Sequence, residues 1–320
     1  MKKRFIILDG SSLLYRAFYA LPLLTSGDGS YTNAIHGFST MLLKLMQEWS
    51  PDLLVVAFDK GKKTFRNDLF DAYKGTRKPT PMELSSQIPL LHELMQAWGI
   101  CLVEKAGYEA DDIIGTLASK AAANGYDALV VTGDRDALQL VRPDLRVLLT
   151  RKGISDMDVY DEAAFREKYK LEPLQLIDLK GLMGDTSDNI PGVPGVGEKI
   201  AAKLLAAYGS VEEVLEHAEE VSGARLREKL IEHRELALLS KKLATIECAV
   251  PIDFDEAAYH VQPEREKLLA FCRKYGMNSV LRSLQKLLAE PDPVVPDDGQ
   301  ASLFAEAAKP EYFSSDNKIG

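Results

Sequence analysis

The sequence predicts an α/β protein with a mainly parallel central sheet flanked by helices, followed by a region that is almost entirely helical. Short apolar runs alternate with helical patterns through the first half of the chain, which is typical of parallel sheets with helices on both faces. Acids directly follow three of these runs, at the strand ends where such sheets bind ligands. The expected strands span residues 4–9, 53–58, 100–103, 128–132 and 145–149.

Helical periodicity predicts the connecting elements and the second half of the chain. In the first half, helices are expected after residues 10–12 and over 33–48, 84–98 and 109–124. From residue 161 the pattern is helical nearly throughout, at 161–169, 173–183, 198–207, 211–217, 224–231, 234–245, 264–274 and 278–289. After residue 289 the sequence is acidic, rich in proline and without periodicity, which predicts a linker or disordered tail.

Composition limits the compartment and the protein class. The chain has 320 residues, 46% of them hydrophobic, enough for one large domain or two smaller ones. No apolar run reaches the length of a membrane span. The short run after the basic residues 1–4 ends in Asp9, so a strand is expected there and not a signal peptide. The cysteines Cys101, Cys248 and Cys272 match no zinc pattern, which favours a reducing cytoplasm.

Acids are concentrated at strand ends and at the start of one helix. Carboxylates gathered at one sheet edge repel one another unless cations lie between them. All-oxygen ligation suits hard ions such as Mg²⁺ or Mn²⁺, and about two such ions serve in phosphodiester chemistry. The chain carries a net charge of −9, and the candidate ligands are also nine in number: Asp9, Asp59, Glu109, Asp111, Asp112, Asp134, Asp136, Asp185 and Asp188. Bound cations would offset much of this charge, so nucleic acid is not excluded as a partner.

A basic segment begins one residue after Asp59. Between residues 60 and 78, seven Lys/Arg stand against two acids, with aromatic residues between them. Most charge runs are solvated surface loops, but this placement favours an element that grips phosphates beside the metal ions.

A glycine-rich turn at 192–197 opens the helix expected at 198–207. Closely spaced glycines free backbone N–H groups to approach a phosphate at a helix N-terminus. The stretch resembles a helix-hairpin-helix element, which binds the DNA backbone without regard to sequence. The residues concerned are Gly192, Gly195, Gly197, Lys199 and Lys203.

Taken together, these motifs resemble the 5′-nuclease family of flap endonucleases, and most of all the 5′→3′ exonuclease domain of bacterial DNA polymerase I. The resemblance covers residues 4–289. Its motifs are Leu8-Asp9-Gly10-Ser11 with Tyr15-Arg16, Ala57-Phe58-Asp59 with Thr64-Phe65-Arg66, Tyr73-Lys74 with Arg77, Tyr108-Glu109-Ala110-Asp111-Asp112, Thr132-Gly133-Asp134-Arg135-Asp136, and the run from Gly184 to Lys199.

The resemblance implies a role for each of these residues. One ion would be held by Asp9, Asp59, Glu109, Asp111 and Asp134, and a second by Asp136, Asp185 and Asp188, with Asp112 in the outer shell. Tyr73, Lys74, Arg77 and Arg16 would act at the scissile phosphate. Lys62, Lys63, Arg66 and Lys78 would contact DNA together with the glycine-rich turn, where a K⁺ ion is also implied.

The resemblance further implies a catalytic core over residues 1–170 with a helical arch at 60–98, and a DNA-binding region over 171–289 with its hairpin at 189–207. The tail at 290–320 would be a linker toward a polymerase domain in the same chain. The expected enzyme is a monomer that acts at the bacterial nucleoid on 5′ flaps, nicked or 5′-ended duplexes and RNA-primed ends. Two alternatives remain open at this point: a PIN-type ribonuclease and a non-catalytic module that binds DNA structures.

Overall fold

The computed structural model describes residues 2–61, 63–151, 153 and 156–288. Residues up to Leu287 belong to one compact unit. The tail expected at 290–320 lies outside the described residues. Among the described helices, none has both the length and the apolar character needed to cross a membrane.

The centre of the unit is a six-stranded sheet with strand order β3-β2-β1-β4-β5-β6. Its first five strands are parallel and β6 is antiparallel at the edge. The predicted mainly parallel sheet is therefore confirmed. The strands are β1 (Arg4–Asp9), β2 (Leu53–Phe58), β3 (Cys101–Glu104), β4 (Asp127–Thr132), β5 (Leu145–Thr150) and β6 (Met157–Tyr160). The sequence analysis missed β6, a four-residue strand with a polar residue in it, too short for a periodic signal.

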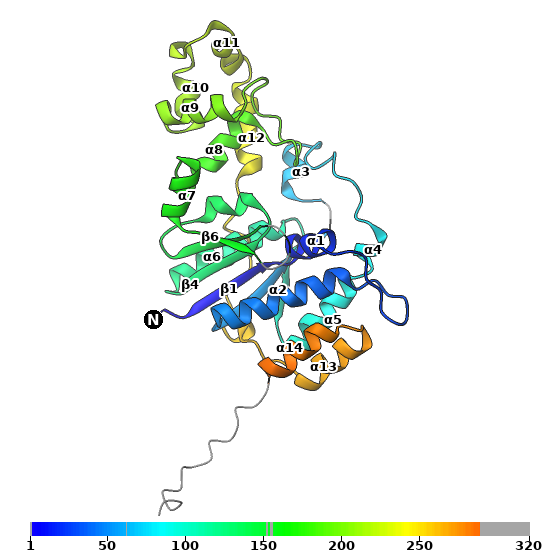
Figure 1. Cartoon of the computed structure of the whole chain (residues 1–320). Helices are drawn as coiled ribbons and strands as arrows, with labels where there is room; N and C mark the ends of the chain where they lie inside the picture. Colours follow the sequence, from blue (N-terminus) through cyan, green and yellow to red (C-terminus); the bar gives the residue numbers. More distant parts are fainter. Residues whose placement is uncertain (1, 62, 152, 154–155, 289–320) are drawn as a thin grey trace, which may run out of the picture. The chain divides into compact units, whose positions relative to one another are not determined.

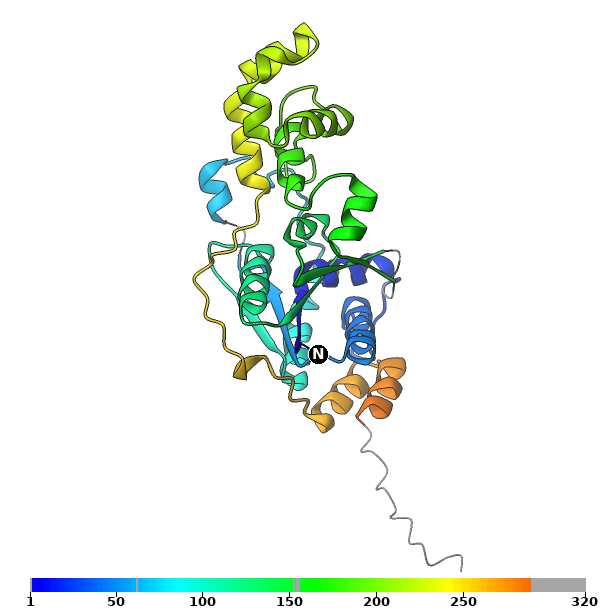
Figure 2. The same ribbon diagram turned by 90° about the vertical axis from the view of Figure 1, so that its left-hand side faces the viewer.

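Helices cover both faces of this sheet. Figure 2 shows α6 (Ala110–Ala123, teal) on one side of the strands and α1 (Gly10–Ala20) with α2 (Asn33–Trp49, both blue) on the other. The side chains of Phe5 and Ile7 belong to the core that α6 completes, and all six residues of β2 are buried. A strand buried on both faces needs apolar residues throughout, which explains the unbroken apolar runs of the sequence.

The basic segment contains short helices that periodicity did not predict. A five-residue helix, α3 (Phe65–Leu69), begins after Thr64, whose N–H donates to Asn67 Oδ1 at 3.0 Å. The helix expected at 84–98 is divided into α4 (Met82–Ser85) and α5 (Ile88–Trp98). The part between α3 and α4, around residues 70–81, is a series of turns, which is compatible with its glycine, proline and lysine content.

The second half is helical, as predicted. Its helices are α7 (Glu162–Tyr169), α8 (Gln175–Met183), α9 (Glu198–Tyr208), α10 (Val211–Glu216), α11 (Ala224–Glu232), α12 (Arg234–Ala244), α13 (Arg265–Lys274) and α14 (Asn278–Leu287). Between α12 and α13 the chain runs back along the sheet (Figures 1 and 2), and α13 and α14 pack against α5 and α2. Shorter 3-10 helices occupy Arg135–Leu140, Ala218–Glu220 and Ala257–Tyr259.

Candidate active site

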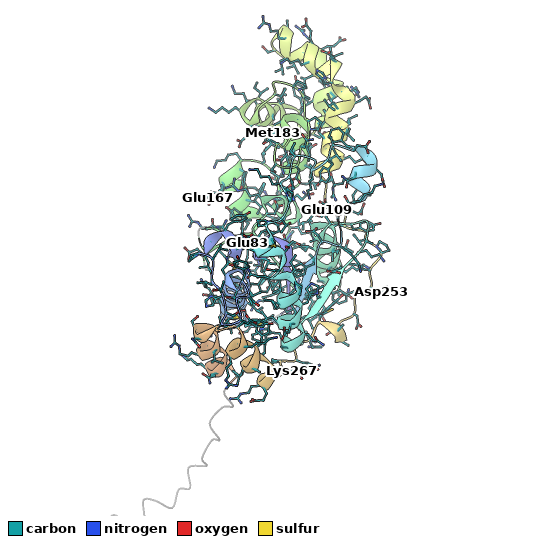
Figure 3. The ribbon with its side chains drawn as sticks, turned by 90° about the vertical axis from the view of Figure 1, so that its right-hand side faces the viewer. Glu83, Glu109, Glu167, Met183, Asp253 and Lys267 are labelled. Atoms are coloured by element: carbon teal, nitrogen blue, oxygen red, sulfur yellow. The ribbon has the colours of Figure 1, made fainter. Side chains whose placement is uncertain are left out.

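A hollow of about 470 Å³ opens at the carboxyl edge of the sheet. Strand pairing brings the ends of β1, β2 and β4 side by side there, since Asp9 is in register with Ala57 and Leu8 with Val131. In Figure 3, Glu109 lies between the sheet and Met183 of α8, at the start of α6. The lining consists of Asp9, Ser11, Ser12, Tyr15, Asp59, Lys74, Arg77, Lys78, Glu109, Ala110, Asp111 and Asp134.

Local structure orients several of these acids because they also cap helices. Asp9 is the N-cap of α1 and accepts a hydrogen bond from Ser12 N at 2.9 Å. Asp134 caps the 3-10 helix that follows β4, accepting from Asp136 N at 2.9 Å. Glu109 caps α6. The free N–H groups and dipole of a helix start favour a carboxylate there, so each cap fixes an acid at the mouth of the hollow.

Four acids form an inner set: Asp9, Asp59, Asp111 and Asp134. Within the described residues, no lysine or arginine forms an ion pair with any of them. Burial, together with the neighbouring carboxylates of Asp59 and Asp134, raises the pKa of Asp9 to about 7, against hydrogen bonds from Ser12 and Thr132. Burial and the adjacent acids Asp112 and Glu109 also raise the pKa of Asp111.

Four further acids form an outer set, Glu109, Asp136, Asp185 and Asp188, and these are paired with cations of the chain. Lys74 Nζ lies 2.6 Å from Glu109 Oε2, and Arg77 donates to Asp188. Lys180 of α8 bridges Asp136 and Asp185. Despite that bridge, burial raises the pKa of Asp136 to about 6. For Asp185, hydrogen bonds from Lys180 and Ser187 outweigh partial burial and lower the pKa to about 2.

The donor chemistry of the inner set suits a hard divalent cation. Its four side chains offer only carboxylate oxygens, and Asp111 Oδ1 is buried without a hydrogen-bond partner. Among the described residues, no three acidic, histidine or cysteine side chains are gathered so that they could coordinate one ion as they now stand. The ligand assignments therefore remain predictions, and those of the outer set require the lysine and arginine contacts to rearrange.

Two of the predicted site residues are buried together and do not face the hollow. Arg66 is 1% exposed, and its guanidinium donates twice to Asp112, at 2.8 Å each, and to the carbonyls of Leu243 and Thr245. Asp112 is fully buried and also accepts from the N–H groups of Glu109 and Glu247. The prediction of Arg66 as a DNA contact is wrong, and Asp112 does not face the hollow, because each uses its polar atoms on the other and on the backbone; the outer-shell role of Asp112 stays a prediction.

The predicted residues of the glycine-rich turn also differ in whether they are buried or exposed. Gly192 is buried at φ 61°, its N–H donates to Ser240 Oγ, and a Cβ there would lie 2.2 Å from Gly184 N. Its predicted DNA contact is therefore wrong, since only glycine allows this close packing against the end of α8. The other four predicted residues are exposed at the start of α9: Gly195, Gly197, Lys199 and Lys203.

The other predicted residues occupy different positions around the hollow. Tyr73 is buried, and its hydroxyl donates to Glu109 Oε2 at 3.1 Å and to Asp188 Oδ2 at 3.3 Å. Lys78 lines the hollow, whereas Lys63 is exposed and pairs with Asp68. Arg16 is not in the lining, and its Nε donates to the carbonyl of Gly153 at 3.2 Å. Lys62 lies outside the described residues.

Several residues of the site were not predicted from the sequence. Lys180 lies five positions before Asp185, and a lysine in a mostly apolar helix was a signal that could have found it. Tyr15 and Ser11 line the hollow although only the family motif drew attention to them, and Ser12, which no motif included, lines it too. Thr132 is fully buried and touches two acids through its hydroxyl, which no sequence pattern could show.

Comparison with known families agrees with this geometry. The family model for the "5′-3′ exonuclease, N-terminal resolvase-like domain" matches residues 4–170, and that for the "5′-3′ exonuclease, C-terminal SAM fold" matches residues 171–267. The chain belongs to the 5′-3′ exonuclease family. The predicted family and enzyme class are thus confirmed, and both alternatives that the sequence left open are set aside.

Curated relatives include DNA polymerase I of Bacillus caldotenax, 51% identical over 91% of this chain, and that of Bacillus subtilis, 48% identical over 91%. The chain spans about a third of the length of these relatives, 33% in both cases. The sequence predicted a domain boundary at residue 170. That the two parts on either side of it are separate folding units stays a prediction.

Solved structures share the fold at low sequence identity. The T5 5′-exonuclease, solved with divalent zinc ions, has a TM-score of 0.64 at 21% identity, covering 88% of this chain and 100% of its own. The catalytic core of Rad2 in complex with a DNA substrate has a TM-score of 0.60 at 18% identity, covering 90% and 93% respectively.

Proposed function

We propose that this 5′-3′ exonuclease hydrolyses DNA phosphodiesters with divalent metal ions, at 5′ ends and at the junctions of 5′ flaps. The main support is the inner set, in which four carboxylates line one hollow and none forms an ion pair with a lysine or arginine of the described residues. Such an arrangement stabilises added positive charge strongly. The metal-ion and DNA complexes of structural relatives are consistent with this proposal.

Under this proposal, Mg²⁺ or Mn²⁺ would be held by Asp9, Asp59, Glu109, Asp111 and Asp134. A second ion would be held by Asp136, Asp185 and Asp188, and a K⁺ ion would lie at the turn before α9. When bound, the divalent ions supply an activated water and neutralise charge on the phosphate oxygens. Burial of Asp9 and Asp111 favours this, because a raised carboxyl pKa reflects an unfavourable negative charge that a cation relieves.

Lys74 and Arg77 would then neutralise charge that develops on the scissile phosphate. Both line the hollow, and the nearby acids keep both side chains protonated: burial alone would lower the pKa of Lys74, but Glu109 and Asp188 raise it. The backbone of Lys74 is left-handed, with φ 55°, and its N–H donates to Asp188 O at 2.9 Å. An unfavourable backbone held by tertiary contacts is frequent at functional sites.

The exposed start of α9 would bind the duplex part of the substrate. Gly195 and Gly197 leave backbone N–H groups accessible, and Lys199 and Lys203 are exposed on the first turns. This combination suits a phosphate of the DNA backbone. Lys63 and Lys78 would add contacts near the hollow.

In the cell, we propose that the chain works beside a DNA polymerase within a longer polypeptide. Its curated relatives are DNA polymerases I of which it matches about a third, 33% for the first. Its task there would be to remove flaps and RNA-primed ends at the nucleoid. The three cysteines are free, which suits a reducing cytoplasm, and a monomer suffices because one chain contributes the whole hollow.

The test is single-turnover cleavage of a labelled 5′-flap duplex in EDTA, Mg²⁺, Mn²⁺ and Ca²⁺. We expect cleavage with Mg²⁺ and Mn²⁺, binding without turnover in Ca²⁺, and none in EDTA. Asp134→Ala should abolish cleavage and leave flap affinity largely intact. Asp144→Ala is the matched control, since Asp144 is exposed and pairs with Lys2. Metal-independent cleavage, or near-normal turnover by Asp134→Ala, would contradict the proposal.

A further inference from the structure

Three hydroxyl side chains connect the strand ends that present the inner set. They belong to Thr132, the last residue of β4, and to Ser11 and Ser12 in the first turn of α1. None of them is among the predicted ligands or catalytic residues. Their contacts nevertheless run from one strand-end acid to the next.

The central contact is made by Thr132, which is fully buried. Its Oγ1 donates to Asp9 Oδ2 at 2.7 Å and accepts from the backbone N–H of Asp134 at 2.9 Å. A single hydroxyl therefore uses its proton on the acid of β1 and a lone pair on the residue that follows β4. This one oxygen therefore connects the carboxylate of Asp9 to the backbone of Asp134.

The two serines extend the connection on either side. Ser12 Oγ accepts from Gly133 N at 3.0 Å, while Ser12 N donates to Asp9 Oδ1 at 2.9 Å. Ser11 Oγ accepts from Asp59 N at 3.3 Å, which joins the end of β2 to the same turn of helix. The hydroxyls thus hold three loops that leave three different strands.

We propose that Thr132, Ser12 and Ser11 are positioning residues, which fix the spacing of Asp9, Asp59 and Asp134 so that the three carboxylates bind one divalent cation together. Thr132 has the largest part, because it alone contacts two of the acids. The proposal rests on the metal dependence proposed above. It concerns the supporting contacts, and these act through the acids without touching substrate.

The physical reason is the cost of bringing like charges together. Asp9, Asp59 and Asp134 line one hollow, and their carboxylates repel one another when they are charged, which favours separation of the loops that carry them. Hydrogen bonds between the hydroxyls and backbone N–H groups hold the loops together without adding further charge. Supporting groups of this kind typically change metal affinity or activity by about 10–100-fold when they are removed.

The decisive comparison is Thr132→Val against Thr132→Ser. Valine keeps the shape of threonine and removes the hydroxyl, whereas serine keeps the hydroxyl and removes the methyl group. We expect Thr132→Val to weaken Mn²⁺ binding about 10–100-fold, measured by electron paramagnetic resonance on the DNA-free protein. Thr132→Ser should stay within about threefold of wild type. If Thr132 matters only for packing, serine should be the more harmful change.

Ser12→Ala and Ser11→Ala provide a second measurement should Thr132→Val fail to fold. Both should weaken Mn²⁺ binding, Ser11→Ala less because its bond is the longer one. Ser39→Ala is the matched control: Ser39 is buried and its hydroxyl is bonded to Ile35 O, within α2. Its loss should leave Mn²⁺ binding unchanged.

Flap cleavage at several Mn²⁺ concentrations completes the test. Thr132→Val should need more Mn²⁺ for half-maximal rate and should bind flap DNA normally in Ca²⁺. Mn²⁺ binding by Thr132→Val within twofold of wild type, or equal losses in the valine and serine variants, would overturn the positioning role while leaving the proposed function intact. A wild type that binds no Mn²⁺ would overturn both, and one that binds Mn²⁺ without cleaving flaps would overturn only the function.

Discussion

The inner and outer sets of acids differ in what balances their charge. Asp9, Asp59 and Asp134 are held by helix caps, hydroxyls and backbone N–H groups, and neither they nor Asp111 form an ion pair within the described residues. Glu109, Asp136, Asp185 and Asp188 instead contact Lys74, Arg77 and Lys180. The two sets lie at neighbouring strand and helix ends, so burial alone does not explain the difference.

This difference suggests how the site divides its work. An acid that is oriented but not neutralised is suited to a metal ion, which supplies the missing charge. An acid paired with a flexible lysine or arginine keeps that cation near the phosphate and can release it when another cation arrives. The pKa values differ within the outer set as well: hydrogen bonds lower that of Asp185 to about 2, whereas burial raises that of Asp136 to about 6, in the same direction as the pKa of Asp9.

The largest effect is expected at the buried pair that belongs to neither set. Arg66→Met would leave Asp112 buried without its partner, which typically costs about 3–5 kcal/mol of folding free energy. Urea denaturation measures it. Arg151→Met, which removes an exposed pair with Asp158, should cost less than about 1 kcal/mol. If Arg66→Met instead lowered DNA affinity at unchanged stability, Arg66 would have to be counted among the DNA contacts after all.

The second-largest effect is expected at Lys74 and Arg77, which pair with acids of the outer set. Lys74→Ala and Arg77→Ala should each slow single-turnover flap cleavage about 10²–10³-fold, the typical cost of one lost electrostatic stabiliser. Ground-state affinity should change far less. Lys63→Ala is the control, since Lys63 is 76% exposed and pairs with Asp68, and it should weaken binding in a salt-dependent way at near-normal rate. If Lys74→Ala and Lys63→Ala lost the same small factor in cleavage rate, Lys74 would only bind phosphate and would have no special catalytic role.

The pH dependence of stability should distinguish Asp9 of the inner set from Asp185 of the outer set in the metal-free protein. The pKa of Asp9 is raised from 3.8 to about 7, so the folded state binds its proton more tightly than the unfolded state. Stability should fall as the pH rises from about 4 to 7, with a slope of at most about 1.4 kcal/mol per pH unit for one proton. Asp9→Asn should remove this part of the slope, measured by urea denaturation at several pH values.

Asp185 should behave in the opposite sense. Its pKa is lowered from 3.8 to about 2, so its contribution to stability is present above pH 4 and is lost as the pH falls toward 2. Asp185→Asn should therefore flatten the acid side of the profile only. A common response of Asp9→Asn and Asp185→Asn would break the distinction between the sets.

The smallest effect is expected at the start of α9. Gly195 has φ 82°, and a Cβ there would lie 2.3 Å from Lys229 Nζ, so a substitution would disturb the protein itself. Gly197, the N-cap of α9 at φ −99°, is the cleaner probe, because a Cβ added there would meet no atom within 4 Å. Gly197→Ala should weaken duplex binding about two- to fivefold, because one phosphate contact is a small part of affinity. Short single strands, compared by fluorescence anisotropy, should bind equally well.

Much of the fold could be predicted from particular stretches of sequence. The apolar runs at 4–9 and 53–58 are buried on both faces, and only such strands need unbroken apolar residues. The acids that follow them lie at the same edge because parallel strands end on the same side of a sheet. The strand at 157–160 and the helix at 65–69 were missed, since four or five residues are too few for a period to show.

What the sequence determined by itself is the local chemistry: which residues end strands, start helices and bring charge. Whether a charged side chain faces solvent, metal or another side chain was decided by tertiary contacts. Arg66 and Asp112 were predicted to serve DNA and metal and are paired in the interior, and Lys180 and Thr132 were not predicted but touch two acids each. Partners such as Arg66 and Asp112 lie 46 residues apart, and only the packing of the folded chain brings them together.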